Sequence, residues 1–353
     1  KPEISLYDAM LDENEEGILT RELDIFFEKI KEDVIPLLKK VVAVNDTVDK
    51  EYNYQKFPID KQKEFCSFLA EYIGFDFARG VMAESAHPFT TNLHNHDVRI
   101  TNHFHENNLE SAMFSVIHEG GHALYELGVD DALTLTAVGG GTSMGVHESQ
   151  SRFYENVLGR SEAFWKPIYE KLQNTYPEAL SDIELSQFIR GINKAEPGPV
   201  RTEADELTYP LHIIIRYEIE KMLMEDLISV DELPRVWNEK YEEYLGITPK
   251  NDAEGVLQDV HWSGGAFGYF PSYAIGNAVA AQIYAYMHNE VNVKECLENG
   301  NLMPIREYLR EHIHCFGSTK NMNELLIAMT GEPLNAEYYT KYLTEKYTKL
   351  YLE

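Results

Sequence analysis

The stretch FSVIHEGGHALYELG, residues 114–128, combines an apolar helical pattern with two histidines and a glutamate. Shortly before it, Asn107 and Glu110 stand three positions apart, as in the capping box that starts many helices. Apolar residues then recur at helical spacing; they are Met113, Ile117, Leu124 and Leu127. The pattern predicts one helix that begins after Asn107 and ends at Gly128.

Within this predicted helix, His118 and His122 are four residues apart. At 3.6 residues per turn they lie on one face, so their imidazoles can share one metal ion. Glu119 lies about 100° further round the helix, where it can reach a water beside the ion without binding the ion itself. Two histidine ligands and a glutamate base make the H-E-x-x-H pattern of zinc peptidases. The alternative is a chance match, with both histidines on an ordinary polar surface.

The two glycines between the histidines need a reason. Gly120 and Gly121 each cost about 1 kcal/mol relative to alanine inside a helix. They predict that another backbone or element approaches the helix closely at this point.

A second motif, HESQSRFYEN, begins at His147 and supplies the ligand that the first motif lacks. A catalytic zinc ion usually takes three protein ligands and one water. Glu148 follows His122 by 26 positions (148 − 122), near the start of a second predicted helix. The alternative for Glu148 is a first-turn acid that the helix dipole favours. With both motifs present, we interpret His118, His122 and Glu148 as the ligands of one zinc ion per chain, with cobalt as an alternative ion.

The composition of the chain excludes several other classes of protein. Of 353 residues, 59 are acidic and 31 are basic, which gives a formal net charge of −28. Such a surface repels phosphate backbones and anionic lipids, so we expect neither nucleic-acid nor membrane binding. Three widely spaced cysteines do not form a disulfide framework, and there is no membrane span or signal peptide. These features predict a soluble cytoplasmic protein, and the initial lysine suggests a processed or truncated form.

Helical patterns dominate the rest of the chain. One predicted helix begins with Asp60 as its N-cap and ends at Gly74, and a longer one over residues 203–228 contains Pro210, which predicts a kink or a delayed start. Only Gly80–Thr101 shows a strand pattern. We therefore predict a mainly α fold: one compact helical zinc-peptidase domain over residues 1–353, with a small antiparallel β element beside the active-site groove.

Several motifs, taken in order, resemble those of the M32 metallocarboxypeptidases, the carboxypeptidase Taq family. Besides the two metal motifs, the matching stretches are HPF (87–89), DVRIT (97–101), VRTEAD (200–205) and GVLQDVHW (255–262). The resemblance runs from about residue 7 to the C-terminus. Members of the family are usually longer, so it also implies that N-terminal helices, which help to cover the active-site groove, are missing here.

The resemblance implies a zinc-dependent carboxypeptidase that releases single amino acids from the C-terminus of peptides. Glu119 would be the general base for a metal-activated water. Arg201, within a family motif, is the candidate that binds the substrate's C-terminal carboxylate, since a guanidinium group binds carboxylate through two hydrogen bonds. The alternative is an ion pair between Arg201 and Glu203 or Asp205.

Four further residues complete the predicted site. By resemblance, His261 and Tyr269 would donate hydrogen bonds to the oxyanion of the tetrahedral intermediate. Tyr273 and Arg99 are predicted to bind substrate, the latter by aligning the peptide along the edge of the small sheet or by supporting the metal helix. The alternatives are packing in an aromatic wall for the first three and a structural network beside the sheet for Arg99.

Two other functions remain open at this level. One is a metallo-oligopeptidase or dipeptidyl carboxypeptidase on the same scaffold, which the masses of the products from one peptide would distinguish. The other is an inactive peptide-binding module, which a turnover assay with added zinc would exclude. The expected partners are peptides with a free C-terminus, and the resemblance implies a homodimer.

Overall fold

The computed structural model describes residues 4–353; the first three residues of the predicted domain lie outside the described residues. The chain divides into two compact units. Unit 1 comprises Lys1–Thr47, Lys194–Ala278 and Asn335–Glu353, and unit 2 comprises Val48–Asn193 and Val279–Leu334. Most of the described residues are helical, which confirms the mainly α prediction. Whether the whole chain acts as a single catalytic domain stays a prediction.

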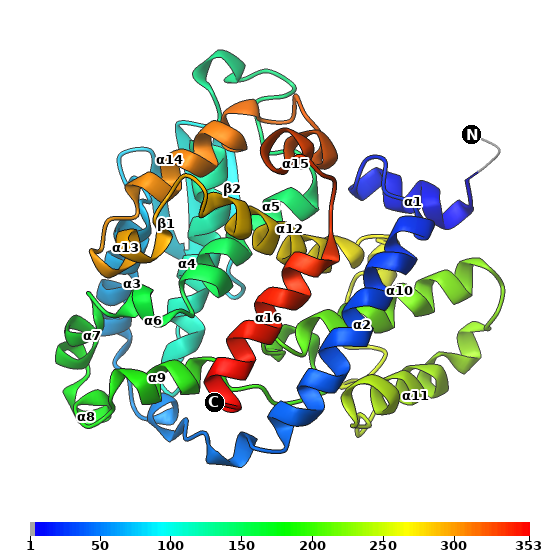
Figure 1. Cartoon of the computed structure of the whole chain (residues 1–353), viewed down its shortest axis with the longest axis horizontal. Coiled ribbons are helices and arrows are strands. Elements are labelled where there is room, and N and C mark those ends of the chain that lie inside the picture. The colour runs from blue at the N-terminus through cyan, green and yellow to red at the C-terminus, as the bar shows by residue number, and fades with distance from the viewer. Residues whose placement is uncertain (1–3) are drawn as a thin grey trace. The chain divides into compact units, whose positions relative to one another are not determined.

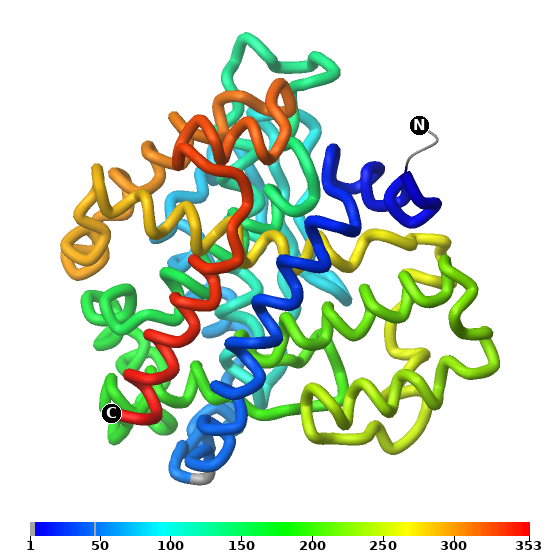
Figure 2. Tube along the Cα trace, turned by 45° about the vertical axis from the view of Figure 1, so that its right-hand side comes forward, coloured from blue at the N-terminus to red at the C-terminus, as the bar shows by residue number. Residues whose placement is uncertain are grey.

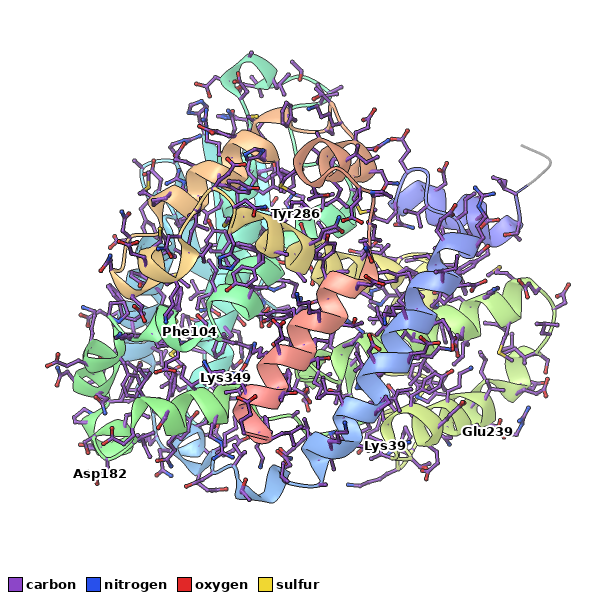
Figure 3. All side chains as sticks on the ribbon, viewed as in Figure 1. Lys39, Phe104, Asp182, Glu239, Tyr286 and Lys349 are labelled. Atoms are coloured by element: carbon purple, nitrogen blue, oxygen red, sulfur yellow. The ribbon has the colours of Figure 1, made fainter. Side chains whose placement is uncertain are left out.

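Unit 1 is built from long helices. They are α1 (Leu6–Asn14), α2 (Thr20–Val42), α10 (Tyr209–Met224), α11 (Leu233–Leu245), α16 (Ala336–Tyr351) and the first half of α12 (Pro271–Met287). Its 3₁₀ helices are η1 (Asn45–Thr47), η5 (Arg201–Glu203), η6 (Val230–Glu232) and η7 (Trp262–Gly264). Helices α2 and α16, which are far apart in the sequence, lie side by side (Figure 1, Figure 2). Lys39, Glu239 and Lys349 are exposed on α2, α11 and α16 (Figure 3).

The start of α10 follows from its proline. Pro210 stands in the first turn, where its missing N–H group costs no helical hydrogen bond. The helix therefore begins at Tyr209 rather than near residue 203. This confirms the predicted delayed start.

Unit 2 combines the small sheet with shorter helices. Its strands are β1 (Gly80–Glu84), β2 (Thr90–His94) and β3 (Asp97–Asn102). Its helices are α3 (Ile59–Ile73), α4 (Leu109–Leu127), α5 (Met144–Arg152), the π-helix η4 (Phe153–Leu158), α6 (Glu162–Trp165), α7 (Tyr169–Thr175), α8 (Pro177–Leu180), α9 (Leu185–Ile192), the second half of α12, α13 (Val293–Glu298), α14 (Met303–His312) and α15 (Met322–Thr330), with the 3₁₀ helices η2 (Glu51–Tyr54), η3 (Asp131–Leu133) and η8 (His314–Phe316).

Helix α4 forms the centre of unit 2. It packs against α3, α5, η4, β2 and β3, and most of its residues are buried (Figure 1). Its N-cap is Asn108, whose side chain accepts a hydrogen bond from the backbone N–H of Ser111, so the predicted cap at Asn107 is wrong by one residue. Its predicted end at Gly128 is confirmed. Because α4 is enclosed on several sides, its side chains are well placed to form a buried site.

For helix α3, the predicted end is confirmed and the predicted N-cap is wrong. It ends at Gly74, whose φ of 105° is the left-handed conformation that favours glycine, as predicted. The predicted N-cap is wrong, because Pro58 occupies that position and Asp60 lies in the first turn.

The sheet has three strands in the order β1-β3-β2. Strands β2 and β3 are antiparallel, as predicted, because only Asn95 and His96 separate them and such a short connection forms a hairpin. Strands β1 and β3 are parallel, so the sheet is mixed rather than fully antiparallel. The chain reverses direction twice between β1 and β3, so these two strands run the same way. Strand β3 then lies between β1 and β2. Over residues 4–353, no helix is both long enough and apolar enough to cross a membrane.

Candidate metal centre

The three predicted ligands come together in unit 2. One ligand atom from each of His118, His122 and Glu148 lies within 4.8 Å of the other two. Oε2 of Glu148 is 3.8 Å from Nε2 of His118 and 3.6 Å from Nε2 of His122. The two imidazole centroids are 4.9 Å apart. Two nitrogen donors from α4 and one oxygen donor from α5 therefore face a common point.

This donor set fits a divalent transition-metal ion. Two imidazole nitrogens and a carboxylate oxygen are ligands that zinc takes in catalytic sites, where a fourth position stays open for water. Glu148 is the fifth residue of α5, which begins at Met144 and has no acidic residue in its first turn. The alternative explanation of Glu148, as a first-turn acid that the helix dipole favours, is therefore wrong.

The glycines of α4 permit the approach of α5 and α3. A Cβ atom on Gly121 would lie 2.6 Å from the carbonyl oxygen of Gln150 and 2.7 Å from the Cα of Ser151, so the backbones of α4 and α5 are in contact. A Cβ atom on Gly120 would meet the end of the Ile73 side chain at 2.4 Å. The prediction that another element approaches closely at these glycines is confirmed. The backbone contact at Gly121 holds Glu148 opposite the two histidines.

We expect Gly121→Ala to lower the free energy of unfolding by about 1–3 kcal/mol, the usual cost of overpacking a core. The new methyl group would meet backbone atoms of α5, which cannot turn aside. Gly120→Ala is the matched control, because its methyl group meets only the end of a side chain and it gains about 1 kcal/mol of helix propensity. Denaturant unfolding of both variants measures the difference. Equal stability of the two variants would contradict this account of the contact.

The carboxylate of Glu148 is oriented by its own helix. Arg152, four residues on, donates from Nε to Oε1 of Glu148 at 2.7 Å and from Nη1 to Oε2 of Glu155 at 3.1 Å. Glu155 lies in the π-helix that continues α5. Such π turns occur frequently at functional sites. With Oε1 held by Arg152, Oε2 of Glu148 is directed toward the histidines.

Glu155 also holds the first histidine. Its Oε2 lies 2.8 Å from Nδ1 of His118, which leaves Nε2 of that ring for a metal. Burial alone would raise the pKa of Glu155, but Arg152 and His118 hold it well below its usual range. Burial alone would lower the pKa of His118, but the carboxylates of Glu148 and Glu155 raise it. The sequence prediction missed Glu155 and Arg152, although both stand in the quoted HESQSRFYEN motif.

The second histidine has a different partner. Nδ1 of His122 lies 2.9 Å from Nδ1 of His147, and Nε2 of His147 lies 2.6 Å from Oε1 of Glu126. Burial holds the pKa of His122 well below its usual value. The sequence prediction quoted His147 as part of a motif without giving it a role, and it did not consider Glu126.

Glu119 lies beside this cluster on α4. It is buried, and its Oε2 is 2.6 Å from the hydroxyl of Thr90 at the start of β2. Burial raises the pKa of Glu119, while the hydroxyl of Thr90 favours the ionised form. A carboxylate with one oxygen anchored in this way has a fixed orientation. Thr90 was not predicted, because nothing in the sequence joins β2 to α4.

Arg201, the residue predicted to bind the substrate's C-terminal carboxylate, belongs to unit 1 and is buried there. Its Nε and Nη2 donate to Oδ1 of Asp259 at 2.9 and 2.7 Å. Neither Glu203 nor Asp205, the partners considered in the alternative, forms this ion pair. Arg216 donates from Nε to the other oxygen of Asp259 at 2.7 Å. Asp259 therefore bridges two guanidinium groups with a single negative charge.

The predicted aromatic residues form a connected group with Arg201 in the same unit. The guanidinium carbon of Arg201 lies 4.9 Å from the ring centroid of Tyr273, and Nε2 of His261 lies 3.2 Å from the hydroxyl of Tyr273. The rings of His261 and Tyr269 have centroids 5.4 Å apart. Burial, together with the charge of Arg201, lowers the pKa of His261 to about 4. Unit 1 therefore brings Arg201, His261, Tyr269 and Tyr273 together, with His261 neutral at physiological pH.

The position of Arg99 differs from the prediction. It lies on β3, the central strand, and not at the edge of the sheet. It is exposed, and its Nε and Nη2 donate to the two oxygens of Asp97 at 2.8 Å each. A central strand cannot align a substrate by strand addition, because both of its hydrogen-bonding edges are paired.

Comparison with known proteins adds independent information. A family model described as carboxypeptidase Taq (M32) metallopeptidase matches residues 1–347. Carboxypeptidase 1 of Bacillus subtilis is 48% identical over 347 residues, which cover 98% of this chain and 69% of the relative. Thermostable carboxypeptidase 1 of Thermus thermophilus is 39% identical over 347 residues, which cover 98% of this chain and 68% of the relative. The crystal structure of an M32 carboxypeptidase from Deinococcus radiodurans, 37% identical, superposes with a TM-score of 0.96 over 98% of this chain and 70% of that chain.

Proposed function

Because this chain belongs to the carboxypeptidase Taq (M32) family of metallopeptidases, we propose that it releases single amino acids from the C-terminus of peptides with one bound zinc ion. The convergence of His118, His122 and Glu148 beside the buried carboxylate of Glu119 carries this proposal. Zinc suits two imidazole nitrogens and a carboxylate, and cobalt is an alternative ion for the same donors.

The chemistry is divided between the ion and the residues of the chain. His118, His122 and Glu148 would hold the ion. When bound, the ion supplies Lewis acidity, which polarises the scissile carbonyl and lowers the pKa of a water. The carboxylate of Glu119 would accept the proton of the attacking water and transfer it to the nitrogen of the leaving amine. The hydroxyl of Thr90 keeps this carboxylate in position.

Recognition of the substrate's C-terminus is assigned to Arg201. Asp259 is shared between Arg201 and Arg216, so these three side chains together carry a formal charge of +1, which favours a carboxylate. The guanidinium group of Arg201 would bind that carboxylate through two hydrogen bonds. Tyr273 lies against Arg201 and would contact the same end of the substrate. Arg99 would contact the peptide from the exposed face of the sheet.

His261 and Tyr269 are proposed as donors to the oxyanion of the tetrahedral intermediate. A neutral imidazole and a phenol can each donate one hydrogen bond to a developing negative charge. The low pKa of His261 and the proximity of the two rings support this role.

Three wider properties are part of the same proposal. The catalytic domain includes both units, and the protein forms a homodimer, which size-exclusion chromatography with light scattering would measure. A cytoplasmic location is supported by three cysteines, Cys66, Cys296 and Cys315, which form no disulfide in the structure.

Peptide products test the proposed activity. We expect the mass spectrum of a short peptide digest to show losses of single C-terminal residues. Amidation of the C-terminus should lower kcat/KM well over tenfold, because each 1.36 kcal/mol of lost binding is a factor of ten. N-acetylation of the same peptide is the matched control and should have little effect. Arg201→Ala should reduce cleavage of the acid and add little loss on the amide, since both changes remove one interaction.

Other product patterns would contradict this proposal in different ways. Dipeptide losses would indicate a dipeptidyl carboxypeptidase, and internal cuts at equal rates in acid and amide would indicate an oligopeptidase. Multiplicative losses from amidation and Arg201→Ala would show that another residue holds the carboxylate. The absence of turnover in the presence of zinc would support the alternative function, an inactive peptide-binding module.

A further inference from the structure

Glu126 is a buried carboxylate of α4 that the proposed mechanism does not use. It is 5% exposed and follows His122 by one helical turn (126 − 122 = 4). Three groups hydrogen-bond to its oxygens: Nε2 of His147 at 2.6 Å, the backbone N–H of Gly141 at 3.0 Å and the side-chain amide of Asn92 at 2.7 Å. A carboxylate with three donors is fixed in place and can only accept hydrogen bonds.

Glu126 determines where the protons lie in the series of hydrogen bonds that runs from Glu126 through His147 to His122. Because Glu126 can only accept, Nε2 of His147 donates to it, and in the tautomer that carries its single proton on Nε2 the Nδ1 of that ring has a lone pair. His122 must then donate from its own Nδ1 to Nδ1 of His147. Its Nε2 is left with a lone pair directed toward the side where Glu148 Oε2 lies, 3.6 Å away. One carboxylate thus selects the tautomer of His122 that can bind a metal.

The glycine-rich loop that contains Gly140 and Gly141 packs against this series of hydrogen-bonded residues. A Cβ atom on Gly141 would lie 2.6 Å from Cδ2 of His147 and 2.8 Å from the ring of Tyr125, so a larger residue there would displace the imidazole. A Cβ atom on Gly140 would meet only the carboxylate oxygens of Glu126, at ordinary distances of 3.5 and 3.8 Å. Both glycines have φ values outside the left-handed region. The two positions therefore differ in contact with the ring and not in backbone conformation.

From these contacts we infer that Glu126 and His147 are positioning residues for the metal, acting through His122, and that Gly141 lets the loop hold the His147 ring in place. This inference rests on the proposed metal site. It also explains why the two histidine ligands differ: His118 is oriented by the carboxylate of Glu155 directly, whereas His122 is oriented by a carboxylate through a second imidazole.

Metal affinity is the measurement that tests this role. The zinc dissociation constant of the full chain is measured by competition with a chromogenic chelator. We expect Glu126→Gln and Gly141→Ala each to raise it by about 10- to 100-fold, the usual effect of changing a partner of a metal ligand. Gly140→Ala is the matched control and should leave it unchanged. His118→Ala serves as the reference for loss of a ligand.

A second measurement covers variants that fail to fold. Nitrogen-15 shifts of the imidazoles in the zinc-loaded wild-type protein report the tautomers, and we expect His147 protonated on Nε2 and His122 on Nδ1. A proton on Nδ1 of His147, or wild-type zinc affinity in Glu126→Gln and Gly141→Ala while His118→Ala loses zinc, would overturn the positioning role alone. Equal zinc binding by His118→Ala and the wild type, or no binding by the wild type, would overturn the proposed metal site as well.

Discussion

Replacing Glu148 by alanine is expected to yield a protein that no longer retains one divalent ion per chain at neutral pH, with the loss of turnover that this entails. Its Oε2 faces the two histidines at 3.6 and 3.8 Å and is the only acidic member of the three-donor cluster. Removing it leaves two imidazole donors, and a catalytic zinc site normally needs three protein ligands. Metal analysis after dialysis, together with a peptide turnover assay, measures both effects.

The control for this variant is another acidic residue of unit 2. Glu162 is an exposed first-turn residue of α6, so Glu162→Ala removes a helical carboxylate without touching the cluster. It should keep full metal content and activity. Circular dichroism of Glu148→Ala distinguishes loss of a ligand from loss of fold. Full metal content and full activity in Glu148→Ala would show that the third ligand is a different residue.

Replacing Glu119 by glutamine should separate metal binding from catalysis. Glutamine keeps the shape of the side chain and can still accept a hydrogen bond from Thr90, but it cannot take up the proton of the attacking water. We expect metal content to stay at the wild-type level while turnover falls by roughly 10²–10⁴-fold, the typical contribution of general-base catalysis. Metal analysis and steady-state kinetics on the same preparation measure both quantities.

Helix α4 provides a matched control for this change. Glu110 is also buried, at 7% exposure against 8% for Glu119, but it lies nine residues earlier (119 − 110), about 13 Å along the helix axis. Its carboxylate contacts Lys50 and Tyr52 rather than the metal cluster. Glu110→Gln should therefore retain near-normal turnover. A similar fall in both variants would point to a general effect on the helix, and near-normal turnover in Glu119→Gln would remove Glu119 from the mechanism.

The features of the site that could be predicted from sequence are those set by local geometry. His118 and His122 share a face because four residues make about one helical turn, and that relation needs no knowledge of the fold. The end of α4 at Gly128 is equally local. The start was wrong by one residue because Asn107 and Asn108 can both cap a helix, and the tertiary structure decides between them.

The features that were missed depend on contacts between distant segments. Glu155 and His118 are 37 positions apart, and their contact depends on a π-helical turn. The periodicity of apolar residues in the sequence does not predict such a turn. The partner of Arg201 is Asp259, 58 residues along the chain, whereas only nearby carboxylates had been considered. The prediction of a fully antiparallel sheet was wrong for the same reason: alternation indicates that a segment is a strand but not which strand lies beside it.

The contact between α4 and α5 at Gly121 has a consequence for how the protein acquires its ion. The ligands are held by one backbone meeting another and by hydrogen bonds between side chains, all of which are made by the protein itself. In small zinc-dependent domains, by contrast, binding supplies the free energy of folding and a chelator unfolds the chain. Here the ligands are held by the core of unit 2, so we expect one ion to leave and another to enter without the protein refolding. Which ion occupies the site in a cell then depends on supply and relative affinity, and not on which ion was present when the chain first folded.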